Sequence, residues 1–283
     1  MKLATVRTQS GTAAVRLEDD GAVHLGAPDV GALLADPAWA ERAASAAGER
    51  MAVEDLDYAP LIPRPEKIVC VGLNYRDHIL EMGRDLPAYP TLFAKYPSAL
   101  VGARDDIVLP AASDAMDWEA ELAIIVGASV RHADEEAAGA AIAGYSVLND
   151  VTARDWQNRT SQYLQGKSFE AATPLGPVLV TADEAGPPRF PIRSEVNGET
   201  MQDDSTEQLL FPPVALVRYI STFVTLRPGD VIATGTPSGV GHARKPPRYL
   251  QDGDVLVTRI DGIGECRNPC RREGPAGQPG RDG

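Results

Sequence analysis

Short runs of β-branched and apolar residues, separated by turns rich in Gly and Pro, dominate the hydrophobic pattern of this chain. Such runs predict strands, whereas apolar residues at helical spacing are confined to a few stretches. The expected strands cover residues 2–8, 13–17, 23–25, 67–72, 107–109, 122–126, 143–148, 177–180, 194–196, 231–234 and 255–260. The expected helices cover about 30–50, 134–141 and 214–223. Because strands and helices do not alternate regularly, the pattern predicts a β-rich α+β fold instead of repeated βαβ units.

The same pattern divides the chain into three predicted parts. Residues 1–60 form a small N-terminal α+β unit, and a proline-rich stretch at 60–65 links it to the rest. Residues 61–270 contain most of the expected strands and form the main domain. Residues 271–283 are rich in Gly, Pro and Arg without an apolar anchor, so we expect a disordered tail.

Composition and charge narrow the classes of function. A hydrophobic fraction of 43% with 24% charged residues is typical of a soluble globular protein. No apolar run approaches the roughly 20 residues that span a bilayer, and the N-terminus lacks the apolar core of a secretory signal. We therefore expect a cytoplasmic protein with no membrane partner. The net charge of −13 also disfavours nucleic acid as a partner.

The three cysteines, Cys70, Cys266 and Cys270, are too few for a disulfide framework. Cys70 lies within an apolar run, where we expect a buried, small hydrophobic side chain.

Two glutamates stand at the start of the apolar run that ends at residue 126. Because successive side chains of a strand alternate between faces, Glu119 and Glu121 project to the same side. Two neighbouring buried carboxylates repel each other, and a divalent cation with a preference for oxygen ligands relieves that repulsion. An isolated pair of this kind is more often a solvated strand face. Asp150, at the end of another apolar run, is placed either to complete a metal site or to cap the next helix.

A histidine and a glutamate follow the first strand of the main domain. His78 and Glu81 are three residues apart on a predicted helix that Asn74 caps and Gly83 ends. They are therefore neighbours on one helix face, where a carboxylate can orient an imidazole for general-base work. The alternative is an incidental ion pair on an exposed helix.

Two glycine-flanked turns are the remaining candidates. Lys167 follows a glycine but is not part of a phosphate-binding loop, because Ser161 stands where that motif needs its first glycine. It is either solvated or supplies the positive charge that an acidic chain needs to bind an anion. The turn at 234–241 allows backbone N–H groups to approach an anion, although tight-turn geometry alone would also explain its glycines.

Taken in order, these segments resemble the fumarylacetoacetate hydrolase family from about residue 67 to residue 269. The motifs are GLNYRDHILEMG, FAKYPSALVG, DWEAELAIIVG, LNDVTARDWQ, GKSF, LGP, ATGTPSGVG and GIGECRN. The resemblance implies the fumarylacetoacetate hydrolase type of catalytic fold, with mixed β-sheets in a β-roll and a small N-terminal appendage, and a homodimer. It also implies a divalent metal, Mg²⁺ with Mn²⁺ as the alternative, held by Glu119, Glu121 and Asp150.

The resemblance further implies roles for single residues. His78 and Glu81 correspond to a catalytic pair in a lid. Gln157 and Lys167 correspond to residues that contact the oxygens and the developing charge of the substrate, which makes Lys167 catalytic as well as substrate-binding. Thr236 corresponds to a loop residue that meets a substrate carboxylate.

The activity implied is Mg²⁺-dependent hydrolysis of a carbon–carbon bond in a 2,4-diketo acid of the acylpyruvate or fumarylpyruvate type, by a water that His78 activates. Decarboxylation of an oxaloacetate-type acid, and isomerisation or tautomerisation of a hydroxymuconate-type diacid, are alternatives on the same metal–enolate platform. A scaffold or binding protein that retains the fold is the non-enzymatic alternative. Leu86, Tyr89 and Phe93 are the residues expected to select the acyl group.

Overall fold

The computed structural model describes residues 1–53, 56–81 and 85–274, and of residues 77, 78 and 81 it describes the backbone alone. The strands are β1 (Lys2–Thr8), β2 (Gly11–Glu18), β3 (Gly21–His24), β4 (Arg50–Met51), β5 (Ile68–Gly72), β6 (Thr91–Lys95), β7 (Leu100–Val101), β8 (Ile107–Leu109), β9 (Met116–Asp117), β10 (Ala120–Val126), β11 (Ile142–Asn149), β12 (Thr152–Ala153), β13 (Thr173–Thr181), β14 (Pro191–Val196), β15 (Glu199–Ser205), β16 (Val231–Ala233), β17 (Val255–Ile260) and β18 (Gly264–Arg272). The α-helices are α1 (Val30–Leu34), α2 (Trp39–Ser45), α3 (Arg76–Glu81), α4 (Glu135–Ala140), α5 (Arg154–Gln157), α6 (Leu164–Lys167), α7 (Ala182–Ala185) and α8 (Pro213–Ser221). The fold is the β-rich one that the sequence predicts, with few and short helices. None of the described helices is long and apolar enough to cross a membrane.

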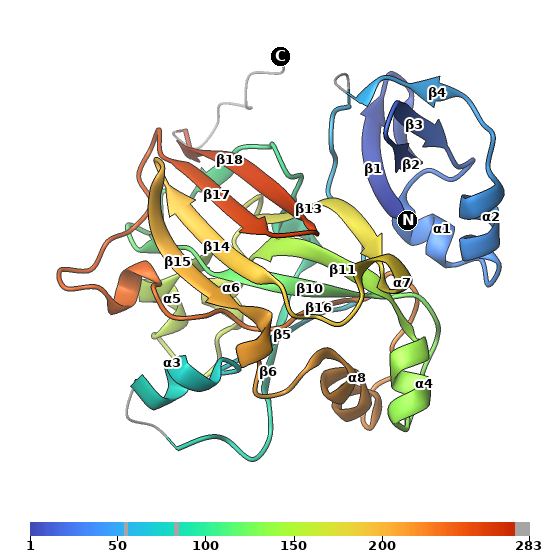
Figure 1. Ribbon diagram of the computed structural model, residues 1–283. Helices are drawn as coiled ribbons and strands as arrows, with labels where there is room; N and C mark the ends of the chain where they lie inside the picture. Colours follow the sequence, from blue (N-terminus) through green and yellow to red (C-terminus); the bar gives the residue numbers. More distant parts are fainter. Residues whose placement is uncertain (54–55, 82–84, 275–283) are drawn as a thin grey trace.

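One large mixed sheet runs through the middle of the molecule (Figure 1). Its strand order is β4-β3-β2-β1-β13-β11-β10-β16-β5-β6, and β7 pairs with β13 outside this path. At its centre, β10 lies antiparallel to both β11 and β16, and β16 lies parallel to β5. All residues of β10 are buried, as expected for a nearly continuous apolar run. The residues at the start of β10 are therefore shielded from solvent on several sides.

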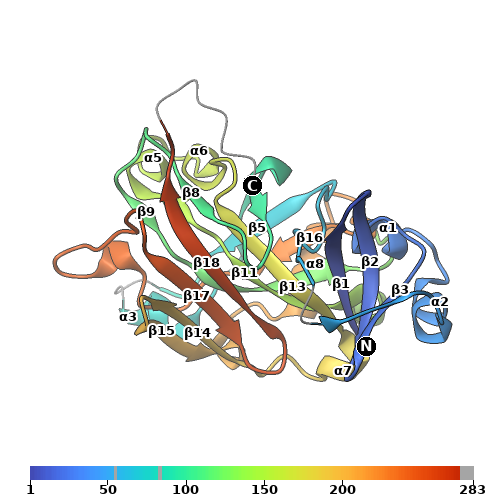
Figure 2. The same ribbon diagram turned by 90° about the horizontal axis from the view of Figure 1, so that it is seen from above.

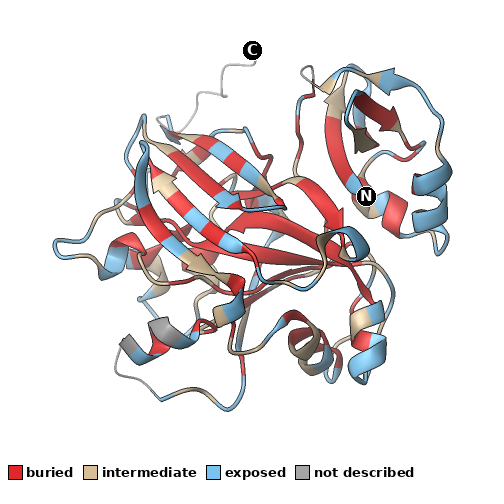
Figure 3. Ribbon diagram, in the orientation of Figure 1, coloured by how far each residue is buried: buried red, intermediate tan, exposed pale blue. Residues whose placement is uncertain are grey.

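A second sheet, with the order β15-β14-β17-β18-β8, packs against the first. In Figure 1 its strands β14, β17 and β18 lie in front of β10, β11 and β13, and the two groups are in contact. Ile192 of β14 and Ile260 of β17 join Leu122 and Ile124 of β10 in one apolar core between the sheets. Bands of buried and exposed residues alternate along the front strands, which is typical of strands with one solvated face (Figure 3).

The two faces of β10 serve two different cores. Leu122 and Ile124 point to the core between the sheets, whereas Ala123 and Ile125 belong to a separate core with residues of β1, β16 and α1. Glu121 is an even number of positions from Ala123 and Ile125, so its side chain belongs to the same face of the strand, and so does that of the glutamate two positions earlier. The alternation that builds the two cores thus also places both carboxylates on one side of the strand.

The N-terminal unit extends the large sheet. Its strand β1 pairs with β13, with Leu3 opposite Leu179, so β1 to β4 continue the sheet to one side (Figure 2). The helix predicted over 30–50 is wrong in extent, because α1 and α2 are separate, Pro37 lies between them and β4 begins at Arg50. The division of the chain into three domains stays a prediction.

The end of the chain also differs from the prediction. Strand β18 was not predicted, and it reaches Arg272, where it pairs with Leu109 of β8. Its two final residues therefore belong to a sheet and not to the disordered tail expected from residue 271. Residues 275–283 lie outside the described residues. Strands β6 and β15 were also missed, because β6 has only three consecutive apolar residues and β15 is mostly polar.

Candidate metal centre and active site

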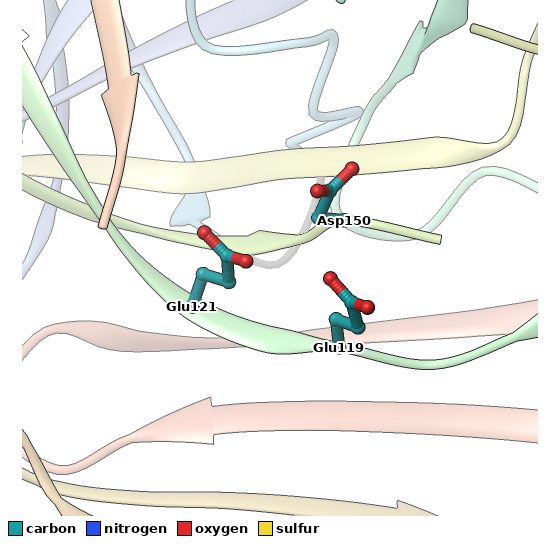
Figure 4. A group of neighbouring side chains, drawn as sticks. All are labelled: Glu119, Glu121 and Asp150. Atoms are coloured by element: carbon teal, nitrogen blue, oxygen red, sulfur yellow. The ribbon is translucent and has the colours of Figure 1, made fainter. Parts of the chain in front are cut away.

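Three buried carboxylates meet where the central strands begin and end. Glu119 precedes β10, Glu121 lies within it and Asp150 follows β11, and each offers an oxygen within 4.8 Å of the others. Their exposed fractions are 7%, 1% and 0%. Figure 4 shows the three carboxylates gathered around a common space. The structure thus brings together the three predicted ligands. Asp150 does not cap a helix, because the next helix, α5, begins after Ala153 without a side-chain cap.

Three cations from other elements surround these carboxylates. Lys167 Nζ lies 2.6 Å from Glu119 Oε2 and 2.8 Å from Asp150 Oδ2. Lys95 Nζ, at the end of β6, lies 2.8 Å from Asp150 Oδ1, and Arg154 Nη1 lies 2.7 Å from Glu119 Oε1. All three cations are buried. The solvated turn considered for Lys167 is therefore wrong, since it is the last residue of α6 and lies within the site.

The electrostatic surroundings separate the carboxylates into two kinds. Burial alone would raise the pKa of the Asp150 carboxyl, but Lys167 and Lys95 outweigh burial and lower it. Burial raises the pKa of Glu121 well above its usual range, and repulsion from Asp150 and Glu119 adds to the rise. The backbone N–H of Gly235 donates to Glu121 Oε2 at 2.8 Å, yet no basic side chain forms a salt bridge with Glu121 among the described residues. Glu121 is thus the carboxylate whose charge is least compensated.

The donor set fits a divalent cation. Carboxylate oxygens in this number are the ligands that Mg²⁺ and Mn²⁺ prefer. Asp150 Oδ1 is buried and accepts no hydrogen bond of acceptable geometry in the described structure, although Lys95 Nζ is near. A cation at this place would stabilise the ionised form of Glu121. The buried acidic group is therefore a candidate divalent-metal site.

The glycine-rich turn after β16 brings the backbone close to the site. Gly235 has φ +97°, and a Cβ there would lie 2.9 Å from the carbonyl oxygen of Val71, so this approach requires glycine. The next residue, Thr236, faces the cavity above the carboxylates, and its Oγ1 accepts a hydrogen bond from Gln202 Nε2 at 2.7 Å. The turn therefore contributes one N–H to a carboxylate and one hydroxyl to the cavity.

The predicted catalytic pair falls largely outside the described residues. Helix α3 carries His78 and Glu81 three residues apart, as expected, but their side chains lie outside the described residues, and so does Gly83. Their role stays a prediction. Asn74 does not cap this helix, because its side chain instead donates to the carbonyl of Phe211 and accepts from the N–H of the same residue.

A cavity of about 220 Å³ opens above the carboxylates. The predicted residues that line it are Glu119, Glu121, Gln157, Lys167 and Thr236. Of the three residues expected to select the acyl group, Phe93 lines this cavity. Leu86 does not line it, and Tyr89 contacts Tyr219 beside a different hollow, so their role in selecting the acyl group stays a prediction.

Among the described residues of the site, those that sequence reasoning missed include Lys95, Asp117, Arg154 and His242. The first three stand inside the motifs FAKYPSALVG, DWEAELAIIVG and LNDVTARDWQ, so attention to charged residues within those motifs would have found them. His242 follows the glycine-rich turn, and no signal in the sequence marks it.

The fold and the cavity define a class of protein in which a buried carboxylate cluster lies at the centre of mixed β-sheets. The sequence matches the description "Fumarylacetoacetate (FAA) hydrolase C-terminal" over residues 67–271, and the chain belongs to this family. The family resemblance and the fold class predicted from the sequence are therefore confirmed.

Individual relatives carry more specific names. The chain is 47% identical over 211 residues to "Oxaloacetate tautomerase fahd2, mitochondrial" of Xenopus laevis, a match that covers 74% of this chain and 66% of that protein, just under two thirds. A fumarylacetoacetate hydrolase from Exiguobacterium antarcticum is 35% identical with a TM-score of 0.85, covering 96% of this chain and all of that one. The 5-carboxymethyl-2-hydroxymuconate delta-isomerase of Mycobacterium smegmatis is 32% identical with a TM-score of 0.83 at the same coverage.

Proposed function

We propose that this chain is a Mg²⁺-dependent tautomerase or isomerase that shifts a proton within a 2-keto acid. The observation that carries the proposal is the buried group of Glu119, Glu121 and Asp150 with Lys167 and Arg154 beside it on one cavity. The names of the relatives favour a proton shift over carbon–carbon hydrolysis. Isomerisation, an alternative in the sequence analysis, therefore replaces hydrolysis as the main proposal.

The three carboxylates would hold the cation, which, when bound, supplies a positive centre that polarises the keto group and stabilises the developing negative charge. Arg154 and Lys167 lie beside this place and suit the carboxylate and keto oxygens of the substrate. Gln157 Oε1 accepts from Arg154 Nη1 at 3.0 Å, which leaves the Gln157 amide N–H groups for substrate oxygens. These side chains orient the substrate while the acidic cluster anchors it.

The buried cations are unsuited to take up the proton. Burial would lower the pKa of Lys167 and of Arg154, but the neighbouring carboxylates outweigh burial and raise both pKa values, which favours the protonated forms. A separate base must remove the proton from carbon and return it to the other end of the system. The predicted pair of His78 and Glu81 on α3 is our candidate, because α3 begins shortly after Val71 and Leu73, which line the cavity.

The test is a direct comparison of reactions with purified protein. Enolic oxaloacetate, whose absorbance falls as it ketonises, is followed with Mg²⁺ and with a chelator, and cleavage of acylpyruvates and fumarylpyruvate is followed in parallel. We expect Mg²⁺-dependent tautomerisation well above the rate with metal alone. Absence of this acceleration, with Mg²⁺ bound, would overturn the proposal.

The second candidate is hydrolysis of a 2,4-diketo acid, favoured by the similarity to the Exiguobacterium antarcticum hydrolase. It predicts acylpyruvate cleavage faster than tautomerisation in the same assay. The scaffold alternative predicts no Mg²⁺ binding by calorimetry. The homodimer and the cytoplasmic location stay predictions.

A further inference from the structure

His242 lines the rim of the cavity and belongs to no part of the proposed chemistry so far. It shares the cavity with Glu119, Glu121 and Lys167, but its side chain is exposed. His242 Nδ1 lies 2.9 Å from the hydroxyl of Tyr249. The ring's Nε2 has no hydrogen-bond partner among the described residues. It carries an N–H in the imidazolium form, and also in the neutral form when the Tyr249 hydroxyl donates to Nδ1. An N–H donor is thus available at the cavity mouth.

The backbone at His242 is hydrogen-bonded to a buried carboxylate of the site. The N–H groups of Gly241 and His242, at the start of the short 3-10 helix η4 (Gly241–Ala243), both donate to the carboxylate of Asp117, at 2.7 and 3.0 Å. The same carboxylate accepts from Arg154 Nε at 2.7 Å. A Cβ on Gly241 would lie 1.9 Å from the carbonyl oxygen of Arg248, so the loop closes tightly on itself here. Asp117 therefore sets the position of His242 relative to Arg154.

The charges on the cavity floor accommodate one substrate carboxylate. Among the described residues, the buried charged groups there are the carboxylates of Asp117, Glu119, Glu121 and Asp150 and the cations Lys95, Arg154 and Lys167. With every carboxylate ionised, they carry one net negative charge, which a divalent cation turns into one net positive charge. A single carboxylate of a chelating keto acid neutralises that charge. A second carboxylate would leave the floor negative unless another cation meets it.

The other basic side chains that the structure describes near His242 do not meet this need. Arg248 Nη1 binds Glu199 Oε2 at 2.6 Å, and Arg244 Nη2 donates to the carbonyl of Met201 at 3.0 Å. Neither arginine lines the cavity. Among the described lining residues, those able to carry a positive charge are Arg154, Lys167 and His242, and the first two are already paired with floor carboxylates.

We propose that His242 binds the distal carboxylate of a 2-keto dicarboxylic acid and makes the cavity selective for diacids over 2-keto monoacids. Tyr249 is the positioning residue that orients the imidazole. This inference rests on the proposed function, because it assumes that the keto-acid end binds at the metal site. It names the residue that would distinguish the diacids of that proposal from monoacids.

The test uses two ligands of equal carbon number. 2-Oxoglutarate and 2-oxovalerate differ only in the distal carboxylate, and both are titrated by calorimetry into the Mg²⁺-loaded protein. We expect the wild type to bind 2-oxoglutarate about 10- to 100-fold more tightly, the range of a charge-assisted hydrogen bond. His242→Ala should remove this preference while leaving the affinity for 2-oxovalerate unchanged. His242→Gln, which keeps an N–H donor without a charge, should restore part of it.

Matched variants separate orientation from a general surface effect. Tyr249→Phe should weaken 2-oxoglutarate binding less than His242→Ala, again without an effect on 2-oxovalerate. His132→Ala, another exposed histidine beside an arginine, should change neither affinity. Equal weakening of both ligands by His242→Ala, or a wild type that does not distinguish them, would overturn the inference. A wild type that distinguishes them but does not tautomerise oxaloacetate would overturn the proposed reaction and leave the diacid site standing.

Discussion

The floor of the cavity and its rim are built in different ways. On the floor, charged groups such as Asp150 and Lys167 lie at strand ends and in short helices, fully buried and bound to more than one partner. At the rim, His242 is exposed, and its side chain contacts a single described hydrogen-bond partner, Tyr249. The same residues of the floor thus contribute to stability and to the proposed reaction, whereas rim residues can be substituted without disturbing the core.

This difference has an energetic consequence. Removing one member of a buried ion pair leaves its partner charged and desolvated, which typically costs about 3–5 kcal/mol. Changing an exposed side chain usually alters stability by less than about 0.5 kcal/mol. Variants of the floor are therefore expected to change stability and activity together, and variants of the rim to change selectivity alone.

The largest expected effect is that of Asp150→Asn. Lys95 and Lys167 would lose the charge that compensates them, so the free energy of unfolding should fall by about 3–5 kcal/mol. Mg²⁺ binding should be lost, and activity should drop by about 10³ because an essential electrostatic contact disappears. Chemical denaturation and calorimetry measure the two effects. Retention of wild-type Mg²⁺ affinity would refute the assignment of Asp150 as a ligand.

Glu121→Gln is the matched variant within the floor. Burial and neighbouring carboxylates raise the pKa of Glu121, and no basic side chain forms a salt bridge with it in the described structure. The neutral amide should therefore leave stability without Mg²⁺ unchanged or slightly higher, while Mg²⁺ binding is lost as in Asp150→Asn. Equal destabilisation by both substitutions would show that the two carboxylates are not held in different ways.

His78→Ala tests whether the proton-transfer group lies apart from the floor. We expect turnover to fall by about 10²–10⁴, the range for loss of a general base, with Mg²⁺ affinity nearly intact. Glu81→Gln should cause a smaller loss, because the imidazole remains but is less well oriented. Initial rates and calorimetric titrations measure these effects. Near-full activity of His78→Ala would exclude the pair from catalysis.

The raised pKa of Glu121 predicts a pH dependence of the floor. Below its folded-state pKa, Mg²⁺ must displace a proton, so affinity should weaken by up to about tenfold per pH unit as pH falls. Without metal, the contribution of Glu121 to the free energy of unfolding changes with pH in the opposite direction to the Mg²⁺ affinity. This carboxyl stabilises the fold below its unfolded-state pKa, and that contribution disappears as pH rises through the folded-state pKa. Melting temperatures with and without Mg²⁺ across pH should converge toward acid, and parallel curves would contradict the assignment.

The sequence predicted the floor better than the rim, for a physical reason. Alternation along one strand is local, so the shared side of Glu119 and Glu121 follows from the sequence alone. The burial of Lys167 does not, because a lysine is exposed by default and becomes buried only where the fold supplies carboxylates. Lys95 pairs with Asp150 only because β6 lies beside β5 in the sheet, and that strand was not predicted.

The rim depends on contacts between residues that are even farther apart in the sequence. His242 reaches the cavity because its loop returns to Asp117, more than a hundred residues earlier in the chain. A pattern of apolar and polar positions does not record such a contact. In the N-terminal unit, by contrast, neighbouring strands pair in sequence order, and the strand predicted at 2–8 is found unchanged as β1.

The smallest expected effect concerns the thiols, which test how firmly the two packed sheets exclude solvent. Cys70, Cys266 and Cys270 are each 0% exposed, which confirms Cys70 as a buried small hydrophobe. Burial raises the pKa of all three thiols, that of Cys270 to about 12, so little reactive thiolate forms near neutral pH. A chromogenic disulfide reagent should therefore label no thiol in the native protein and all three after denaturation. Because the thiols are already buried, Mg²⁺ should not alter this result. Cys70 lies near the floor, so labelling of Cys70 that Mg²⁺ suppresses would show that the floor opens.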